Sequence, residues 1–235
     1  MTPVEKNDID VSKLFEWGKK FTITWRSKSI DAHIRLVGDA ELNRSRVFAL
    51  RNSAEYRRKL LDYNSEERLA NIPDYQATTK EALVEALLLY SKEDFTSDAI
   101  NNVEIKLPKE LPSDATLEQQ EKHQKEVDEF PEKRNKAILD YIAKKFEDKK
   151  NELNKLSRKD LYDKFVIAAI NEVCRNEFLK AFRSMCTYFG CYKDEEFKTR
   201  LFNSYEEFDN LPTEVKASLV EKYISLEVSV EDLKA

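Results

Sequence analysis

The N-terminal part of the chain alternates apolar and polar residues in two short runs, 21–25 and 30–36. A period of two is typical of β-strands that bury one face, and the short connection between the runs predicts a β-hairpin. An isolated hairpin is marginally stable in water, so we expect this one to pack against a helix or a partner chain. The predicted buried face consists of Phe21, Ile23, Trp25, Ile30, Ala32, Ile34 and Leu36.

A long helix is predicted from Asp39 to about Leu61, with Asp39 as its N-terminal cap. Its apolar residues form two sets that lie about 140° apart around the helix, so this helix has two surfaces to cover. Arginines recur every seven residues, at Arg44, Arg51 and Arg58, and form a separate basic stripe. One apolar set is Val47, Leu50, Ala54 and Leu61, and the other is Leu42, Ala49, Tyr56 and Leu60.

The middle of the chain is predicted to be helical and highly charged. A leucine-rich helix is expected over 79–95, and strand-like alternation follows at 103–107. Thr116 begins another helix with a capping-box pattern, and Pro131 is expected to break it. Segment 114–156 holds eleven acidic and ten basic residues, and this mixture indicates an exposed helical hairpin. Its one docking seam would be Ala137, Ile138, Tyr141, Ile142, Lys145 and Phe146.

The C-terminal third has three helix signals. Ser157 begins a helix with strong apolar spacing, and Gly190 is placed to end it. Ser204 caps a short helix, and Pro212 stands at the start of the last one. Together with the hairpin, these elements predict a mainly α fold: a helical body with a small N-terminal β-hairpin and an extended charged helical segment. The expected parts are 1–112, 113–156 and 157–235, the last being continuous with the first.

Composition excludes several classes of function. Only three of the 235 residues are glycine, whereas phosphate loops and dinucleotide folds need glycine for tight turns and close backbone approach. The common nucleotide-binding, hydrolase, zinc-protease and EF-hand motifs do not occur. We therefore expect no enzyme, no catalytic residue and no cofactor. No apolar run approaches the roughly 18 residues of a membrane span, so no membrane partner is expected either.

Cysteines and histidines are few. Cys174, Cys186 and Cys191 lie in one aromatic-rich region, and His33 and His123 have no cysteine at ligand spacing. We therefore expect buried structural thiols and no metal site. Spacing alone leaves a catalytic Cys–His pair open, but no neighbouring group would activate a thiolate. Reduced thiols and an acidic N-terminus without an apolar stretch favour the cytoplasm.

Charge is distributed unevenly along the chain. Residues 34–60 carry a local charge of +4, whereas residues 204–235 carry −5, which equals the net charge of the whole chain. The two segments are either ordinary solvated faces or surfaces that attract each other, within one subunit or in a homo-oligomer. The arginines of 39–61 also allow nucleic-acid binding. That class is disfavoured because the isoelectric point is about 5.4 and no nucleic-acid-binding motif occurs.

Two parts of the chain resemble a known family. The N-terminal part reads LFEWGKKFTITW over Leu14–Trp25 and RLVGDAELNRSRVFALRNSAEYRRKL over Arg35–Leu60, and the last part runs from Tyr205 to Lys234 through the Leu-Pro pair at 211–212. These parts are similar to bacteriophage virion-assembly proteins, in particular the tail assembly chaperones of long-tailed phages. That family pairs a small N-terminal β element with a helical body and ends in a docking helix. The charged segment 114–156 has no counterpart there, which leaves a minor virion or connector protein as an alternative.

The resemblance implies a non-enzymatic protein in the host cytoplasm, with retention in the virion left open. Its partners would be phage tail proteins of the tape-measure or tail-tube type, whose apolar helical segments it would hold until tail subunits polymerise. Contacts through amphipathic helices are expected, with aromatic and arginine anchors. The candidate partner-binding residues are Arg44, Arg51, Arg58, Tyr56 and Trp17. A host-encoded helical adaptor of similar composition is the competing class.

Overall fold

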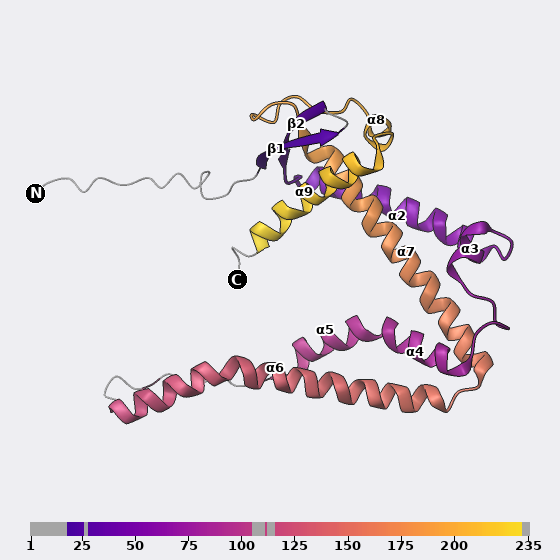
Figure 1. Ribbon diagram of the computed structural model, residues 1–235, viewed down its shortest axis with the longest axis vertical. Helices are drawn as coiled ribbons and strands as arrows, with labels where there is room; N and C mark the ends of the chain where they lie inside the picture. Colours follow the sequence, from indigo (N-terminus) through magenta and orange to yellow (C-terminus); the bar gives the residue numbers. More distant parts are fainter. Residues whose placement is uncertain (1–17, 26–27, 105–110, 112–115, 232–235) are drawn as a thin grey trace, which may run out of the picture. The chain divides into compact units, whose positions relative to one another are not determined.

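The computed structural model describes residues 18–25, 28–104, 111 and 116–231 (Figure 1). Within these ranges the protein is mainly α-helical and carries a small three-stranded antiparallel sheet near its N-terminus, which confirms the predicted fold class. The described residues form two compact units: the first lies within 1–61 and 173–235, and the second within 62–172. The division of the sequence at 112 and 156 stays a prediction, because compactness alone does not define parts that fold independently.

The sheet of the first unit begins with the predicted hairpin. Strands β1 (Gly18–Trp25) and β2 (Lys28–Arg35) pair antiparallel, with Phe21 opposite Ala32 and Ile23 opposite Ile30. A two-residue strand, β3 (Cys191–Tyr192), pairs with β2 and completes the order β1-β2-β3; it was not predicted. Side chains of one face are buried as expected, with Ile23 5% exposed and both Ala32 and Ile34 fully buried. The side chains of Trp25 and Ile30 lie outside the described part.

The hairpin is covered by the last helix, α9 (Thr213–Glu231), which packs against β1 and β2 and fulfils the expected need for a helical partner. Beside α9 lie the end of α7 (Arg158–Gly190) and a short helix, α8 (Tyr205–Asp209). The core therefore joins residues from both ends of the chain. Its buried members are Ile23, Ala32, Ile34, Cys186, Cys191, Phe202, Phe208, Val215, Leu219, Tyr223 and Leu226.

Helix α7 ends at Gly190 as predicted, but for a different reason. Gly190 does not have the positive φ of a left-handed helix cap. Instead, a Cβ atom at this position would lie 2.6 Å from the backbone oxygen of Arg35 in β2. Glycine is needed here because the helix end approaches the strand closely.

The structure separates the two apolar sets of α2 (Asp39–Leu61), whose bounds match the prediction. Ala49 and Leu60 are fully buried, whereas Val47 and Leu50 are 49% and 56% exposed. The helix was expected to have two surfaces to cover, and only one of them is covered by the described residues. Val47, Leu50 and their neighbours on that side form an apolar face that is open to solvent.

The second unit contains four helices in its described part besides the start of α7. They are α3 (Glu66–Asn71), α4 (Lys80–Tyr90), α5 (Lys92–Asn102) and α6 (Leu117–Asn154). Helix α3 was not predicted, and the single helix expected over 79–95 is divided at Ser91. The Ser91 hydroxyl donates to the backbone oxygen of Leu87 at 2.9 Å, a bond that tends to bend helices. Helix α5 then continues to Asn102, and the strand pattern at 103–107 lies mostly outside the described residues.

Helix α6 begins at the predicted capping box and runs unbroken through Pro131, so the expected helical hairpin of 114–156 is wrong. Most side chains around Pro131 are exposed, and water can satisfy the carbonyl that the proline leaves without a donor. Helix α6 packs against α4 and α5 instead. The predicted seam makes this contact: Tyr141 donates to Asp98 at 2.7 Å, and the Lys145 Nζ lies 3.1 Å from the same carboxylate. Both bonds hold the pKa of Asp98 below its usual value.

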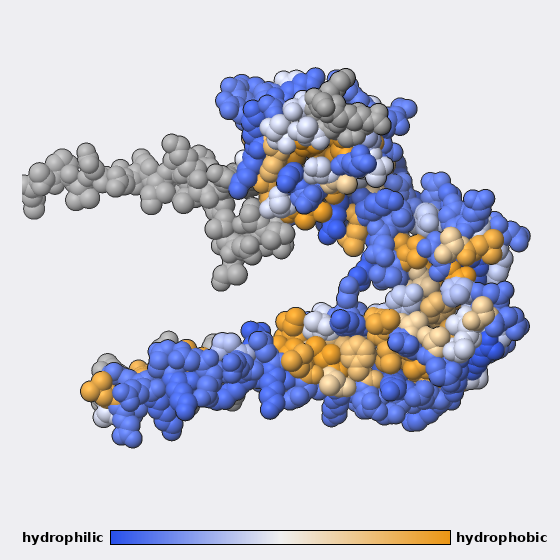
Figure 2. All heavy atoms as spheres, in the orientation of Figure 1, coloured by the Kyte–Doolittle hydropathy of each residue, from blue (hydrophilic) through white to orange (hydrophobic). Residues whose placement is uncertain are grey.

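Figure 2 shows how the surface of the second unit changes along α6. Hydrophilic side chains cover the N-terminal part of α6, whereas hydrophobic ones gather over α4 and α5. Exposed apolar residues there include Leu89 and Ile100, which are 65% and 54% exposed. None of the helices in the described ranges has a stretch long and apolar enough to cross a membrane.

Candidate protein-binding groove

A groove with a volume of about 900 Å³ lies on the first unit. Its walls are α2, the second half of α7, α8 and α9, so residues far apart in the sequence meet there. Most of its apolar side chains are half-buried, and they keep apolar surface available to a ligand. The apolar lining consists of Phe48, Leu179, Ala181, Tyr205, Ala217, Val220 and Ile224.

Tyr205 joins three of the groove's walls. Its ring meets that of Phe48 on α2 edge-on, with the centroids 4.9 Å apart, and its hydroxyl donates to the Ser184 hydroxyl on α7 at 3.2 Å. The ring of the fully buried Phe208 packs beside that of Tyr205, with the two ring centroids 5.9 Å apart. Burial raises the pKa of the Tyr205 phenol, so this group stays neutral near pH 7. The aromatic contacts fix the width of the groove at this point.

The charged residues of the groove are partly paired with each other. Lys216 Nζ lies 2.8 Å from the Asp209 carboxylate and also donates to the Asp209 backbone oxygen. Lys180 lies 3.6 Å from Glu177, in an exposed pair. Arg183 on α7 and Glu221 on α9 form no ion pair with any described residue. The groove is therefore apolar along its floor and carries single charges along its edges.

A smaller hollow of about 400 Å³ adjoins the groove along α2. Phe48 lines both hollows, together with Arg44, Val47 and Arg51 in the smaller one. At about 100° per residue, the arginine stripe lies between the exposed apolar face and the groove wall. Arg44, Arg51 and Arg58 are all exposed and make no ion pair within the described ranges. The surface thus continues from the groove, across a basic stripe, to exposed Val47.

The structure brings together part of the predicted partner-binding set. Arg44, Arg51 and Arg58 share one exposed side of α2, beside the groove. Tyr56 lies on the opposite side of the helix and is half-buried, so it is not grouped with them. Trp17 lies outside the described residues. The groove residues of α7, α8 and α9 were not predicted as a site.

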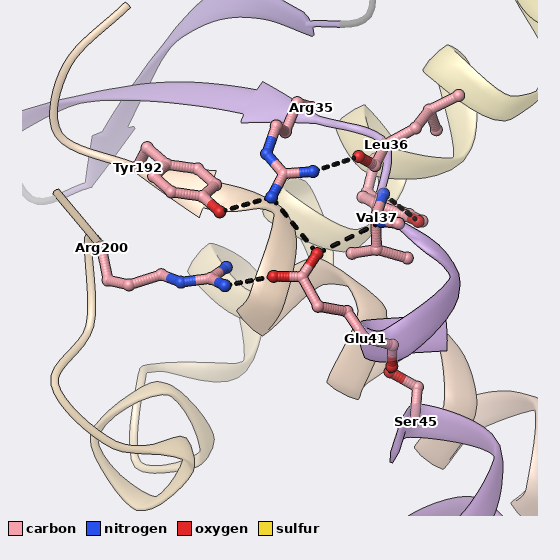
Figure 3. A network of polar contacts seen from close by, with 9 residues as sticks. Arg35, Leu36, Val37, Glu41, Ser45, Tyr192 and Arg200 are labelled. Carbon is pink, nitrogen blue, oxygen red and sulfur yellow. Dashed lines mark hydrogen bonds and ion pairs between the residues drawn. The ribbon is translucent and has the colours of Figure 1, made fainter. Parts of the chain in front are cut away.

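A polar network fixes the start of α2 against the sheet (Figure 3). The Glu41 carboxylate accepts from Arg35 at 3.3 Å and from Arg200, while Arg35 also donates to the Tyr192 hydroxyl at 2.7 Å. Both guanidinium groups lie against the Tyr192 ring, with distances to its centroid of 5.1 Å for Arg35 and 4.6 Å for Arg200. The network joins β2, α2 and β3 and so holds one wall of the groove in place.

The three cysteines are buried, and none of them lines the groove. Cys174, Cys186 and Cys191 are free thiols, and all three are buried. Burial raises the pKa of each thiol, and that of Cys191 reaches about 12. The nucleophilic thiolate is therefore disfavoured at each position. Among the described residues, no group of three or more histidine, cysteine or acidic side chains is placed to hold a metal ion.

The buried thiols predict a loss of stability at high pH. In the unfolded chain Cys191 loses its proton near the ordinary pKa of 9.0, whereas the folded protein retains it until about 12. The unfolded state binds fewer protons in this window, so the free energy of unfolding should fall by up to about 1.4 kcal/mol per pH unit above pH 9. Urea denaturation between pH 7 and pH 11 measures this slope, and Cys191→Ala should reduce it. An unchanged free energy of unfolding across the window would contradict the burial of the thiol.

The chain matches no protein-family model, no curated protein and no solved structure. The resemblance to tail assembly chaperones therefore rests on the two sequence segments alone.

Proposed function

We propose that this chain is a non-enzymatic protein-binding protein and that its groove holds an amphipathic helix of a partner. The observation that carries the proposal is the half-buried apolar lining between α2, α7 and α9. Grooves between helices bind the apolar face of a partner helix, which fills the position of one more helix in the packing. Phe48 and Tyr205 would be the aromatic anchors because they lie at the junction of the walls.

We further propose that the protein belongs to the virion-assembly class and acts as a tail assembly chaperone. The resemblance of its N-terminal and C-terminal segments to that class supports this assignment, and so does a helical body with a small N-terminal sheet. The partner would be a phage tail protein of the tape-measure or tail-tube type. Such a chaperone needs surfaces that shield apolar helical segments, and the groove and the apolar face of α2 supply them.

The test is capture of a tail protein with and without a blocked groove. The tagged chain is recovered from its phage-infected culture at about 150 mM salt, and bound proteins are identified by mass spectrometry. Ala217 lines the groove and is exposed, so Ala217→Arg should fill the groove without unfolding the protein. We expect this variant to capture the tail protein at least about tenfold less than the unmodified chain.

The matched control is Ala143→Arg, which adds the same side chain at an exposed position of α6 in the second unit. It should leave capture unchanged. If both variants captured equally less tail protein, or if Ala217→Arg captured as much as the unmodified chain, binding in the groove would be contradicted. Recovery of the protein alone as a defined oligomer would favour a structural or connector role. Recovery of nucleic acid without tail proteins would favour the basic stripe as a nucleic-acid site.

A further inference from the structure

We propose that the groove selects acidic amphipathic helices, with the apolar face of the partner helix in the groove and its acidic edge along α2. This inference rests on the proposed function and adds the chemistry of the partner. The charges that border the groove supply this selectivity, because the apolar lining by itself would accept any helix with an apolar face.

The edge of the groove formed by α2 is positive. Arg44 and Arg51 line the adjoining hollow with Phe48, and they lie within about 60° of Phe48 around the helix. Arg58 continues the stripe about two turns further along. Glu55 is the only exposed acidic residue among the described residues on this side of α2, since Glu41 is half-buried and held by Arg35 and Arg200, so the edge keeps a net positive charge. None of the three arginines has an ion-pair partner within the described chain, and a ligand can supply one.

The opposite edge has the opposite sign. On α9, Lys216 is neutralised by Asp209, and Glu221 remains as an exposed carboxylate with no ion pair to the described residues. Arg183 on α7 is a further exposed cation of the groove lining. A bound helix with acidic side chains would gain contacts along α2 and α7, and it would be repelled if it turned that edge toward Glu221. The charges therefore select both the partner's sign and its orientation.

A nucleic acid would also be attracted to the arginine stripe, but it would not need the apolar groove. The two ligands respond in opposite ways to Ala217→Arg. The added side chain blocks a helix from the groove, whereas its positive charge would strengthen the binding of a polyanion. This variant therefore separates an acidic helix from a nucleic acid by the sign of its effect.

The test uses two synthetic helical peptides of about 20 residues that share the same leucine positions and carry either glutamate or lysine at the flanking positions. Their binding to the full chain is measured by fluorescence anisotropy at about 50 mM and about 500 mM salt. We expect the glutamate peptide to bind about tenfold tighter than the lysine peptide at low salt, and the difference to shrink at high salt. Ala217→Arg should weaken both peptides.

The double variant Arg44→Glu/Arg51→Glu should abolish or reverse the preference for the glutamate peptide. Both arginines are exposed and make no ion pair within the described ranges, so this variant should keep its fold. Circular dichroism checks that it is folded. If it is not, Arg44→Gln/Arg51→Gln replaces it in the same measurement. Lys136→Glu/Lys144→Glu is the matched control: it makes the same change of net charge at exposed positions of α6 outside the groove, and it should leave the preference for the glutamate peptide unchanged.

Equal binding of the two peptides, a preference that the double variant leaves unchanged, or no binding of either peptide would overturn this inference. A different result contradicts the proposed function: capture of the tail protein that the Ala217→Arg substitution does not reduce.

Discussion

Replacing Phe208 with alanine is expected to lower the free energy of unfolding by about 3–5 kcal/mol. Phe208 on α8 is fully buried, and its ring lies 5.3 Å from that of Phe202 and 5.9 Å from that of Tyr205, measured between centroids. Removing the ring leaves a cavity that these aromatic neighbours cannot fill without moving. Urea denaturation followed by circular dichroism measures the loss. Because Tyr205 packs beside Phe208 and lines the groove, partner capture should weaken as well.

Leu139→Ala is the control for this prediction, since Leu139 on α6 is 65% exposed. Its effect on the free energy of unfolding should stay within about 0.5 kcal/mol. An effect of Phe208→Ala that is equally small would mean that α8 does not close the core of the first unit.

Glu41→Gln is expected to cost about 2–3 kcal/mol of stability. The Glu41 side chain is 15% exposed and lies between Arg35 and Arg200, which are 26% and 35% exposed. Neutralising the carboxylate leaves two partly buried guanidinium groups with no anion between them, so the cost exceeds that of a lost surface pair. Thermal or urea denaturation at pH 7 measures it.

The matched control is Glu55→Gln on the same helix, because Glu55 is exposed and has no ion pair among the described residues. Its effect should be within about 0.5 kcal/mol. If the two variants lost equal stability, the network of Figure 3 would not contribute to holding α2 against the sheet.

Elements with a strong local signal were predictable from the sequence. The hairpin follows from the alternation of Ile23, Ala32 and Ile34 with polar residues, and the bounds of α2 follow from its cap and apolar spacing. The capping hydroxyl of Ser204 accepts from the backbone where the pattern placed it. In each case a few neighbouring residues contain the whole physical cause.

Elements that depend on distant contacts or on solvent were not predictable. Strand β3 has only two residues, Cys191 and Tyr192. It forms because these residues follow the end of α7, which lies close to the edge of β2. Pro131 predicts a break in the helix, yet α6 continues through it because the surrounding residues are exposed to water. The division at Ser91 is not visible in the apolar spacing, which continues across it, and the hydrogen bond from the Ser91 hydroxyl to the backbone oxygen of Leu87 appears only in the structure.

The groove could be predicted only in part. Two apolar sets on α2 indicated two surfaces to cover, and among the described residues the set that contains Val47 and Leu50 stays exposed. The arginine stripe was visible as well. The groove itself is formed by residues of α2, α7, α8 and α9, such as Phe48, Leu179 and Val220, and their meeting is a property of the packing.

The composition of the first unit's core also determines when that unit can form during synthesis. Ile34 is made early, but Tyr223 and Leu226, which cover it, emerge from the ribosome almost two hundred residues later. At about 5–20 residues per second, the hairpin would wait on the order of 10–40 s for its covering helix. The whole of the second unit is made within that interval. The nascent N-terminal hairpin is therefore expected to stay without its covering helix until α9 is complete, although residues 62–172 have already been made.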